Sequence, residues 1–317
     1  MKLSLPYSDP LQLSETLNEL GQVTRITQFD AGAGSYSMSH ASALGVSLAE
    51  IKASKTLLYE GWGTAWSVDF NWITPVKNSL SPMGLCEGYE MKATSIGGLN
   101  TYNGSPGNSW GKYSPLCSST ACMLDKSILM ESMIACNAQR GIENLINNRG
   151  LEVSAELSVQ LKRMAKKDLM TGGISNPSKY YDLIICCLED GKPRTYKKSE
   201  AKNHALLSEI VRLAHDAKKM SSPMTLGDVC QFLDTGQASL YRVCQKYFGM
   251  GIIEMMMQVR LEESRRALLR CQDQSATVEE NMIRDVAVQY GFKHAGRYAR
   301  RYFNCFGELP SQTLQNL

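Results

Sequence analysis

The last third of the chain contains one short segment twice, at an offset of 57 to 58 residues. The first copy opens with Leu226–Cys230 (LGDVC) and the second with Ile283–Ala287 (IRDVA). Each copy continues with a similar string, Leu240–Gly249 (LYRVCQKYFG) in the first and Tyr298–Gly307 (YARRYFNCFG) in the second. The repeat indicates two copies of one small fold.

Each copy is predicted to form two helices around a tight turn. The first helix is short and amphipathic, and the second begins near Gln237 in one copy and near His294 in the other. This arrangement is the helix-turn-helix motif, whose second helix enters the major groove of DNA. Between the copies, the apolar residues of Gly251–Arg270 share one stripe, which predicts a rigid spacer helix. We predict the first motif at about 225–249, the spacer helix at 251–270 and the second motif at about 282–306.

Arginines occupy equivalent places on the two second helices. Arg242 and Arg300 each lie two residues after a predicted core residue. An arginine side chain can pair with guanine O6 and N7 together, or it can hold a phosphate. Most exposed arginines are only solvated, but the repeated context favours DNA contact here, although the net charge of the whole chain is only +3. The basic candidates in and around the two helices are Arg242, Lys246, Lys293, Arg297, Arg300 and Arg301.

The rest of the chain predicts a second kind of domain. The 317 residues are about twice the length of a typical domain, and a composition of 43% hydrophobic and 21% charged residues is that of a folded globular protein. The first ~130 residues hold short β-branched or aromatic runs broken by Gly, Ser, Asn or Pro, which predicts a sandwich or barrel. Examples are Gln22–Phe29, Val46–Ala53 and Ala65–Ile73.

Helical spacing follows the predicted strands. From about residue 118 apolar residues such as Met123 and Ile128 recur with a period near 3.6, and Leu151–Met170 is strongly helix-forming. Gly191–Lys198 is a polar, basic stretch of the kind that joins domains. A further amphipathic helix begins near Ser199 and is expected to end at Ser221–Pro223. We therefore predict a β-rich domain at 1–195 whose second part (about 118–190) is helical, a linker helix at 196–224 and a domain at 225–317.

All four tryptophans lie in the β-rich half. Aromatic side chains inside a small barrel can line a ligand cavity, but they form plain core more often. Both interpretations stay open at this point. The candidate ligand-binding residues are Trp62, Trp66 and Trp72.

The C-terminal residues resemble the AraC/XylS family of bacterial transcription regulators over Thr225–Leu314. The resemblance is carried by the first helix-turn-helix, the Arg260–Leu268 run in the spacer, and three strings near the end. The sequence of Phe292–Tyr298 and the GELPS string are most similar to those of the subgroup of ethanolamine-operon regulators. The three strings are Val286–Phe292 (VAVQYGF), Arg297–Arg300 (RYAR) and Phe306–Ser311 (FGELPS).

The resemblance implies which positions contact DNA. In the first recognition helix they are Gln237, Ala238, Tyr241, Arg242 and Gln245, and in the second His294, Ala295, Gly296, Arg297 and Arg300. This chain departs from the family pattern twice. Asp234 stands in the first turn, where the family usually has Gly, and Asp tolerates the left-handed conformation better than most residues do. Cys271–Asn281 is longer than the same stretch in the shortest family members.

Other chemistry finds little support in the sequence. The ten cysteines show no CxxC pair, and the four histidines do not cluster with acids or cysteines, so we expect free thiols and no metal site. No apolar run reaches the ~18–20 residues that cross a bilayer, and the N-terminus lacks the pattern of a signal peptide. Asp30–Ser35 (DAGAGS) lacks a complete GxGxxG and is expected to be a turn.

These observations predict an α+β protein of two domains. The N-terminal domain is a β-rich sandwich or cupin-like barrel with helices, and the C-terminal domain is all-α with two helix-turn-helix motifs joined by a spacer helix. The resemblance implies a transcription activator that binds promoter DNA and RNA polymerase as a homodimer. We expect the protein to be cytoplasmic and to need no cofactor. Its N-terminal domain would bind a small-molecule effector or a regulatory protein. Two alternatives are an N-terminal domain that only dimerises or binds an anti-activator, and an enzyme with an appended DNA-binding domain.

Overall fold

The structure, a computed structural model, divides the chain into two compact units. The first comprises Met1–Ile26 and Ser35–Lys198, and the second comprises Thr27–Gly34 and Ser199–Leu317. The structure describes all residues except 1–2, 8, 22–23, 62–63, 65, 77–83, 87–88, 100–101, 103–108, 148–149, 195–197, 217–221, 272–278 and 316–317.

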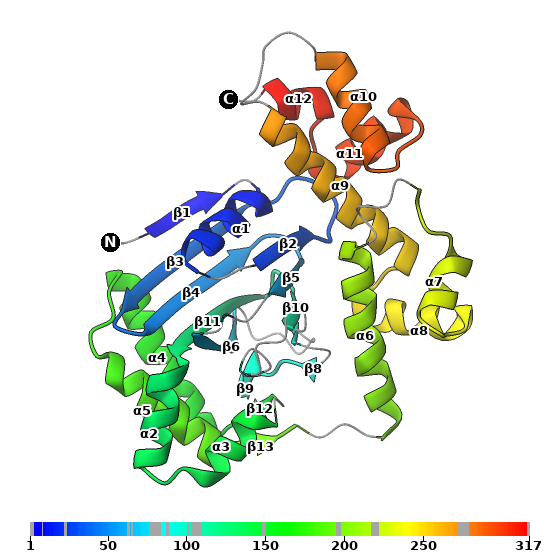
Figure 1. The fold of residues 1–317 in the computed structure, drawn as a ribbon. Helices are drawn as coiled ribbons and strands as arrows, with labels where there is room; N and C mark the ends of the chain where they lie inside the picture. The colour runs from blue at the N-terminus through cyan, green and yellow to red at the C-terminus, as the bar shows by residue number, and fades with distance from the viewer. Residues whose placement is uncertain are drawn as a thin grey trace. The chain divides into compact units, whose positions relative to one another are not determined.

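The first unit is built on two five-stranded sheets (Figure 1). One sheet has the order β1-β3-β4-β11-β6, and each of its neighbouring pairs is antiparallel. Its strands are Leu3–Tyr7 (β1), Tyr36–Ala43 (β3), Val46–Ala53 (β4), Cys117–Asp125 (β11) and Ser67–Pro75 (β6). The other has the order β2-β5-β10-β7-β8, with strands Thr24–Gln28 (β2), Leu57–Gly61 (β5), Ser109–Tyr113 (β10), Gly84–Cys86 (β7) and Tyr89–Glu90 (β8). The division between the units falls within β2, after Ile26. A small sheet joins Ser95–Ile96 (β9), Leu151–Glu152 (β12) and Lys192–Pro193 (β13).

Helices cover the outer face of the first sheet. Alternate residues of β6, such as Phe70 and Trp72, point into one large core together with Tyr180 and Ile184 of α5. A smaller core forms where Leu13 and other residues of α1 pack against β3 and β4. The helices of this unit are Pro10–Glu19 (α1), Lys126–Ala135 (α2), Gln139–Ile146 (α3), Ala155–Thr171 (α4) and Pro177–Asp190 (α5).

The described part of the second unit is helical apart from its connections and Thr27–Gly34. Its long helix α9 (Ile252–Cys271) runs between the α7–α8 pair and the last three helices (Figure 1). A core of α9, α10 and α11 residues includes Leu268, Ala287 and Tyr302. The other helices are Lys198–Asp216 (α6), Leu226–Phe232 (α7), Gln237–Phe248 (α8), Glu279–Gln289 (α10), Ala295–Phe306 (α11) and Pro310–Gln315 (α12).

The β-rich first unit and the helical second unit agree with the predicted fold class. Some predicted boundaries were wrong. Met123, expected on a helix, lies in β11. This strand is buried on both faces, so its sequence lacks the alternation of apolar and polar residues that would have indicated a strand. The helix expected from Leu151 begins at Ala155, after the short strand β12 and an N-cap at Ser154. The linker helix α6 is described as far as Asp216, and residues 217–221, next to its predicted end at Ser221–Pro223, lie outside the described residues.

No described helix is both long and apolar enough to cross a membrane. All ten cysteines are free thiols. Among the described residues there is no group of three or more His, Cys, Asp or Glu side chains placed to hold a metal ion.

Candidate nucleic-acid interface

The first helix of the first motif, α7, is fixed by a capping box at its start and by one core residue. Thr225 caps α7 by accepting from the backbone N–H of Asp228, and the Asp228 carboxylate accepts from Thr225 N in return. This capping box satisfies two donors that a helix start leaves unpaired. These hydrogen bonds hold the pKa of Asp228 below its usual value. Val229 of α7 is fully buried, so the helix is anchored by its core residue as well as by its cap.

The turns of the two motifs share one backbone feature. Asp234 has φ +44° and Gly291, 57 residues later, has φ +81°. Both therefore lie in the left-handed region that lets the chain reverse within a few residues. The recognition helices also end alike, at Gly249 (φ +75°) and Gly307 (φ +77°). The repeat seen in the sequence is thus a repeat of backbone conformation.

Both recognition helices bury one face and leave the other to solvent. Leu240, Val243 and Phe248 anchor α8, and Tyr298 and Tyr302 anchor α11. The opposite faces hold every residue that the sequence proposes for DNA contact, and all of them are exposed. They are Gln237, Ala238, Tyr241, Arg242, Gln245 and Lys246 on α8, and Lys293, His294, Ala295, Gly296, Arg297, Arg300 and Arg301 on or beside α11.

The arginines of the spacer helix and those of α11 differ in their partners. Within the spacer helix, Arg265 pairs with Glu308 at 2.8 Å and Arg266 pairs with Glu263 at 2.8 Å. By contrast, Arg297, Arg300 and Arg301 of α11 make no ion pair with any carboxylate in the described part of the chain. Their positive charge is therefore available to phosphate groups, which supply much of the affinity of proteins for DNA.

Arg242 is folded back onto its own helix. Its Nε donates to the carbonyl of Ala238 at 3.2 Å, and its Nη2 donates to Ser239 Oγ at 3.4 Å. Both contacts are solvent-exposed, so the side chain can exchange them for a base edge at little cost. Ser239 was not among the sequence candidates, although its exposed place beside Arg242 puts it on the same face.

The recognition helices begin without a side-chain cap. Gly236 precedes α8 and His294 precedes α11, and neither supplies a capping hydrogen bond from its side chain. The first N–H groups of a helix have no intrahelical partner and carry the positive end of the helix dipole. Phosphate oxygens are suitable acceptors for such groups.

A groove of about 690 Å³ connects the two recognition helices. Tyr241 and Gln245 of α8 line it from one motif, and Arg301 and Asn304 of α11 line it from the other. Residues of α9, including Met257, lie between them. The two motifs consequently contribute to one surface, and Asn304, which the sequence did not indicate, belongs to it.

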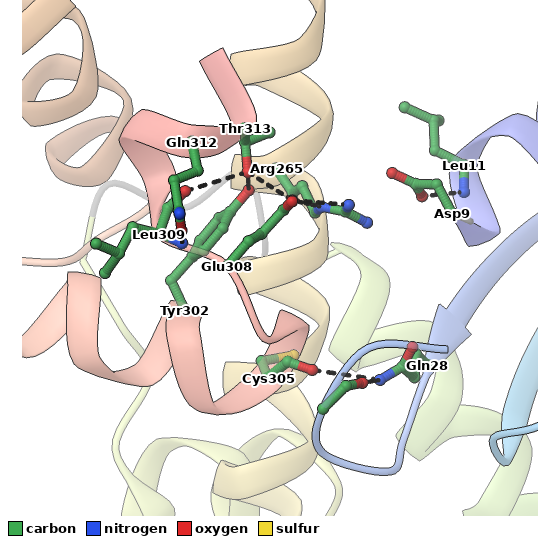
Figure 2. A network of polar contacts seen from close by, with 11 residues as sticks. Asp9, Leu11, Gln28, Arg265, Tyr302, Cys305, Glu308, Leu309, Gln312 and Thr313 are labelled. Carbon is green, nitrogen blue, oxygen red and sulfur yellow. Dashed lines mark hydrogen bonds and ion pairs between the residues drawn. The ribbon is translucent and has the colours of Figure 1, made fainter. Parts of the chain in front are cut away.

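A segment from early in the chain is part of this unit. The ring of Phe29 packs edge-on against Phe248 at the end of α8, with ring centroids 6.3 Å apart. The Gln28 side chain donates to the Cys305 carbonyl at the end of α11 (3.3 Å), as Figure 2 shows. Gln258 of α9 donates to the Gln28 carbonyl at 2.9 Å. Thr27–Gly34 thus contacts both motifs and the spacer, and no local sequence signal indicates this.

A polar network closes the second motif (Figure 2). Arg265 donates from Nε and Nη2 to Glu308 Oε1, at 3.1 and 2.8 Å. Thr313 Oγ1 donates to the same oxygen at 2.7 Å and lies 2.7 Å from the Tyr302 hydroxyl. Since the Thr313 proton is used toward Glu308, Tyr302 is the donor in that pair. The network ties α9, α11 and α12 together through the residue Glu308 of the GELPS string.

Residues 229–316 match the model of a family described as "Helix-turn-helix domain". This part of the chain is a helix-turn-helix domain. The chain is 40% identical over 77 residues to the XylDLEGF operon transcriptional activator of Pseudomonas putida, a match that covers 24% of this chain and 22% of that protein. It is 29% identical over 137 residues to the probable thc operon regulatory protein of Rhodococcus erythropolis, covering 43% of this chain and 38% of that one. The chain thus spans less than half the length of each of these relatives.

Two solved structures are also similar to the chain. An AraC-type regulator from Chromobacterium violaceum is 20% identical, and the match covers 36% of this chain and 94% of that one with a TM-score of 0.30. ToxT from Vibrio cholerae is 11% identical, with 93% and 98% covered and a TM-score of 0.29.

The two described tryptophans among the ligand-binding candidates differ in burial. Trp72 is 2% exposed and packs in the core between β6 and the helices. Trp66 is 47% exposed at the surface. Trp62 lies outside the described residues. Among the described tryptophans, Trp110 lines the cavity between the two sheets.

Proposed function

We propose that this chain is a sequence-specific transcription regulator, and that its AraC-type domain places α8 and α11 in successive major grooves on one face of DNA. The observation that carries the proposal is the pair of equivalent motifs with exposed polar faces and unpaired arginines. Recognition helices in adjacent grooves are about 34 Å apart. The names of the relatives, which are operon activators and regulators, support activation, and RNA polymerase is then the expected protein partner.

The two motifs are proposed to divide their work. Arg242 is surrounded by long polar side chains, Gln237, Tyr241 and Gln245, that reach base edges, whereas α11 begins with Ala295 and Gly296. Arg242→Ala should cost about 1–3 kcal/mol at the cognate site and relax discrimination at one or two base pairs. Arg300→Ala and Arg301→Ala should weaken cognate and unrelated DNA about equally, because phosphate contacts carry no direct sequence information.

Binding-site selection with each variant tests this division. Lys179→Ala, at an exposed basic residue of α5 in the other unit, is the matched control and should leave the preferred sequence and the affinity unchanged. A base preference lost in Arg300→Ala and kept in Arg242→Ala would reverse the assignment, with His294 and Arg297 then reading bases.

The first unit is proposed to control the second, through a small-molecule effector or a regulatory protein. The cavity between its sheets supports the small molecule. An N-terminal unit that serves only for dimerisation or anti-activator binding is the alternative. Thermal-shift screening of the full chain against metabolites distinguishes them, since a bound ligand raises the melting temperature.

Helix α4 is the proposed contact between two copies of the chain. Val159 and Met170, 53% and 65% exposed, lie eleven residues apart and so on one side of this helix. Exposed apolar residues on one face are typical of interaction surfaces. Sedimentation compares the mass of the Val159→Lys variant with that of the wild-type chain. We expect the variant to be monomeric, and equal masses for the two proteins would show that α4 is not the interface.

Two finer proposals follow from the sequence alone. The sequence of Phe292–Tyr298 supports membership of the ethanolamine-operon subgroup. Comparison of the DNA sites selected by this chain with the operators of that subgroup would test this membership. As a regulator of bacterial promoters the protein would act in the cytoplasm, where the chromosome lies, and without catalytic activity of its own.

A further inference from the structure

A groove of about 570 Å³ lies along helices α4 and α5 of the first unit. Residues of both helices line it, together with Ser175 and Asn176 of the connection between them. None of its lining residues lines the cavity between the two sheets. The groove is therefore a separate candidate site, formed by side chains from two helices.

Three of the residues that line the groove are cationic and none is acidic. Arg163 and Lys167 are about one helical turn apart on α4, and Lys179 belongs to α5. All three side chains are exposed, and none makes an ion pair within the described part of the chain. Exposed acids of the two helices, such as Glu156 and Asp182, do not line the groove. Three like charges on one groove repel each other, and a bound anion would offset this repulsion.

A buried carboxylate holds the connection between the two helices. Asp168, which is 1% exposed, accepts hydrogen bonds from Ser175 Oγ and from the Tyr180 hydroxyl, each at 2.9 Å. Asn176 caps α5 by accepting from the backbone N–H of Lys179 at 3.2 Å. The side-chain NH₂ of Asn176 is left over as a donor for a ligand. The polar groups of the groove thus extend from a fixed backbone, which reduces the entropy lost when a ligand binds.

The size of the groove favours a small molecule over a macromolecule. Gln160 and Lys167, the first and last lining residues of α4, are about 10 Å apart along the helix axis. Sites for small molecules have volumes of about 300–1,000 Å³, whereas a stable protein interface uses about 20–30 residues on each side. Met164 and Leu183 add an apolar part to the lining. These features are those of a small-molecule site.

The charges specify the class of ligand. A single negative charge would leave two of the three cations without a partner. The guanidinium of Arg163 can donate to two oxygens of one carboxylate or phosphate, and the lysine ammonium groups bind either anion. We propose that the groove binds a small polyanion, a phosphate ester or a di- or tricarboxylate, through Arg163, Lys167 and Lys179. The proposal goes beyond the proposed function, because neither the recognition helices nor the cavity between the sheets takes part in it.

Calorimetric titration of the full chain with matched probes tests the proposal. Citrate represents the polycarboxylates, pyrophosphate represents the phosphates, and acetate carries a single charge. At equal ionic strength we expect citrate or pyrophosphate to bind at least about tenfold more tightly than acetate, because each further charge pair adds affinity. The tighter of the two indicates whether the ligand carries carboxylate or phosphate groups. The affinity should decrease as salt is added.

Variants that remove one charge from each helix separate the groove from general surface charge. Lys167→Gln and Lys179→Gln should each weaken binding about threefold, and the double variant about tenfold. Lys166→Gln is the matched control, because Lys166 is an exposed lysine of the same helix that does not line the groove. This control should bind as the wild-type chain does. All three substituted side chains are exposed, so the variants should fold as the wild-type chain does, which circular dichroism checks.

Chemical modification locates the bound polyanion on the wild-type chain. Acetic anhydride acetylates accessible lysines, and mass spectrometry follows the reaction at each position. Saturating citrate or pyrophosphate should slow the acetylation of Lys167 and Lys179 and leave that of Lys166 unchanged. This measurement distinguishes the groove from anion binding at the exposed arginines of α11.

Several results would overturn the proposal. These are no binding of either polyanion, acetate binding as tightly as both, equal losses in Lys166→Gln and Lys167→Gln, or no protection of Lys167 and Lys179. DNA affinity is measured with the same variants in the absence of polyanion. A lower DNA affinity of the double variant would assign the groove to DNA instead. Intact DNA binding without any polyanion binding would reject the groove as a site and leave the proposed function standing.

Discussion

Removal of the Glu308 carboxylate should destabilise the second motif by about 2 kcal/mol. Glu308 Oε1 accepts two hydrogen bonds from Arg265 and one from Thr313. Breaking a fully buried ion pair costs about 3–5 kcal/mol, and a surface pair is worth about 0–1 kcal/mol. The side chains of Arg265 and Glu308 are 12% and 23% exposed, which places Glu308→Ala between these limits.

The tryptophans allow the two units to be followed separately. All four lie before residue 111, so tryptophan fluorescence reports on the first unit, while far-UV circular dichroism reports strongly on the helical second unit. In urea, Glu308→Ala should lower the midpoint of the dichroism transition and leave the fluorescence transition in place.

Two further variants complete this test. Glu254→Ala, at an exposed glutamate of the same unit, should change stability by less than about 0.5 kcal/mol. A double variant, Arg265→Met with Glu308→Leu, should recover part of the loss, because no charge is then left unpaired. A loss below about 0.5 kcal/mol in Glu308→Ala, or an equal shift of both transitions, would refute the reasoning.

Three further changes have expected outcomes. Asp234→Gly should stabilise the second unit by up to about 1 kcal/mol in urea unfolding, because it removes a side chain from a left-handed position, and destabilisation would contradict this. Phe29→Ala should lower the free energy of unfolding of the second unit, followed by circular dichroism, by about 2–4 kcal/mol, because the contact with Phe248 is lost. An unaffected dichroism transition would show that Thr27–Gly34 does not stabilise this unit. Since the pKa of Asp69 is raised to about 7, the folded state binds more protons than the unfolded state between pH ~4 and ~7, and stability should fall as pH rises through that window. Asp69→Asn should flatten this slope in fluorescence-monitored unfolding, and equal slopes would contradict the pKa argument.

The two helix pairs of the candidate interface were predictable from sequence because their signals are local. The spacing of Leu240 and Tyr298 from their exposed neighbours fixes which side of each helix is buried. The left-handed turn at Asp234 follows from its place opposite Gly291 in the repeat. Short-range patterns of this kind can be interpreted without knowledge of the rest of the fold.

The cavity and the Thr27–Gly34 contacts depend on packing between distant segments. Both faces of β6 are covered, one by helices and the other by the opposing sheet, so alternation alone does not tell whether Trp72 or Asp69 faces the cavity. In the same way, the sequence around Phe29 indicates a strand and a turn but not its partner Phe248.

Selection of binding sites from random duplex DNA by the full-length chain tests the central claim most directly. Two recognition helices in successive grooves predict a bipartite sequence whose halves are one helical turn, about 10–10.5 base pairs, apart. Affinity for the selected site should fall with salt at a slope of about −0.9 per phosphate contacted. Enrichment of no sequence, or binding that is insensitive to salt, would contradict a DNA-binding regulator.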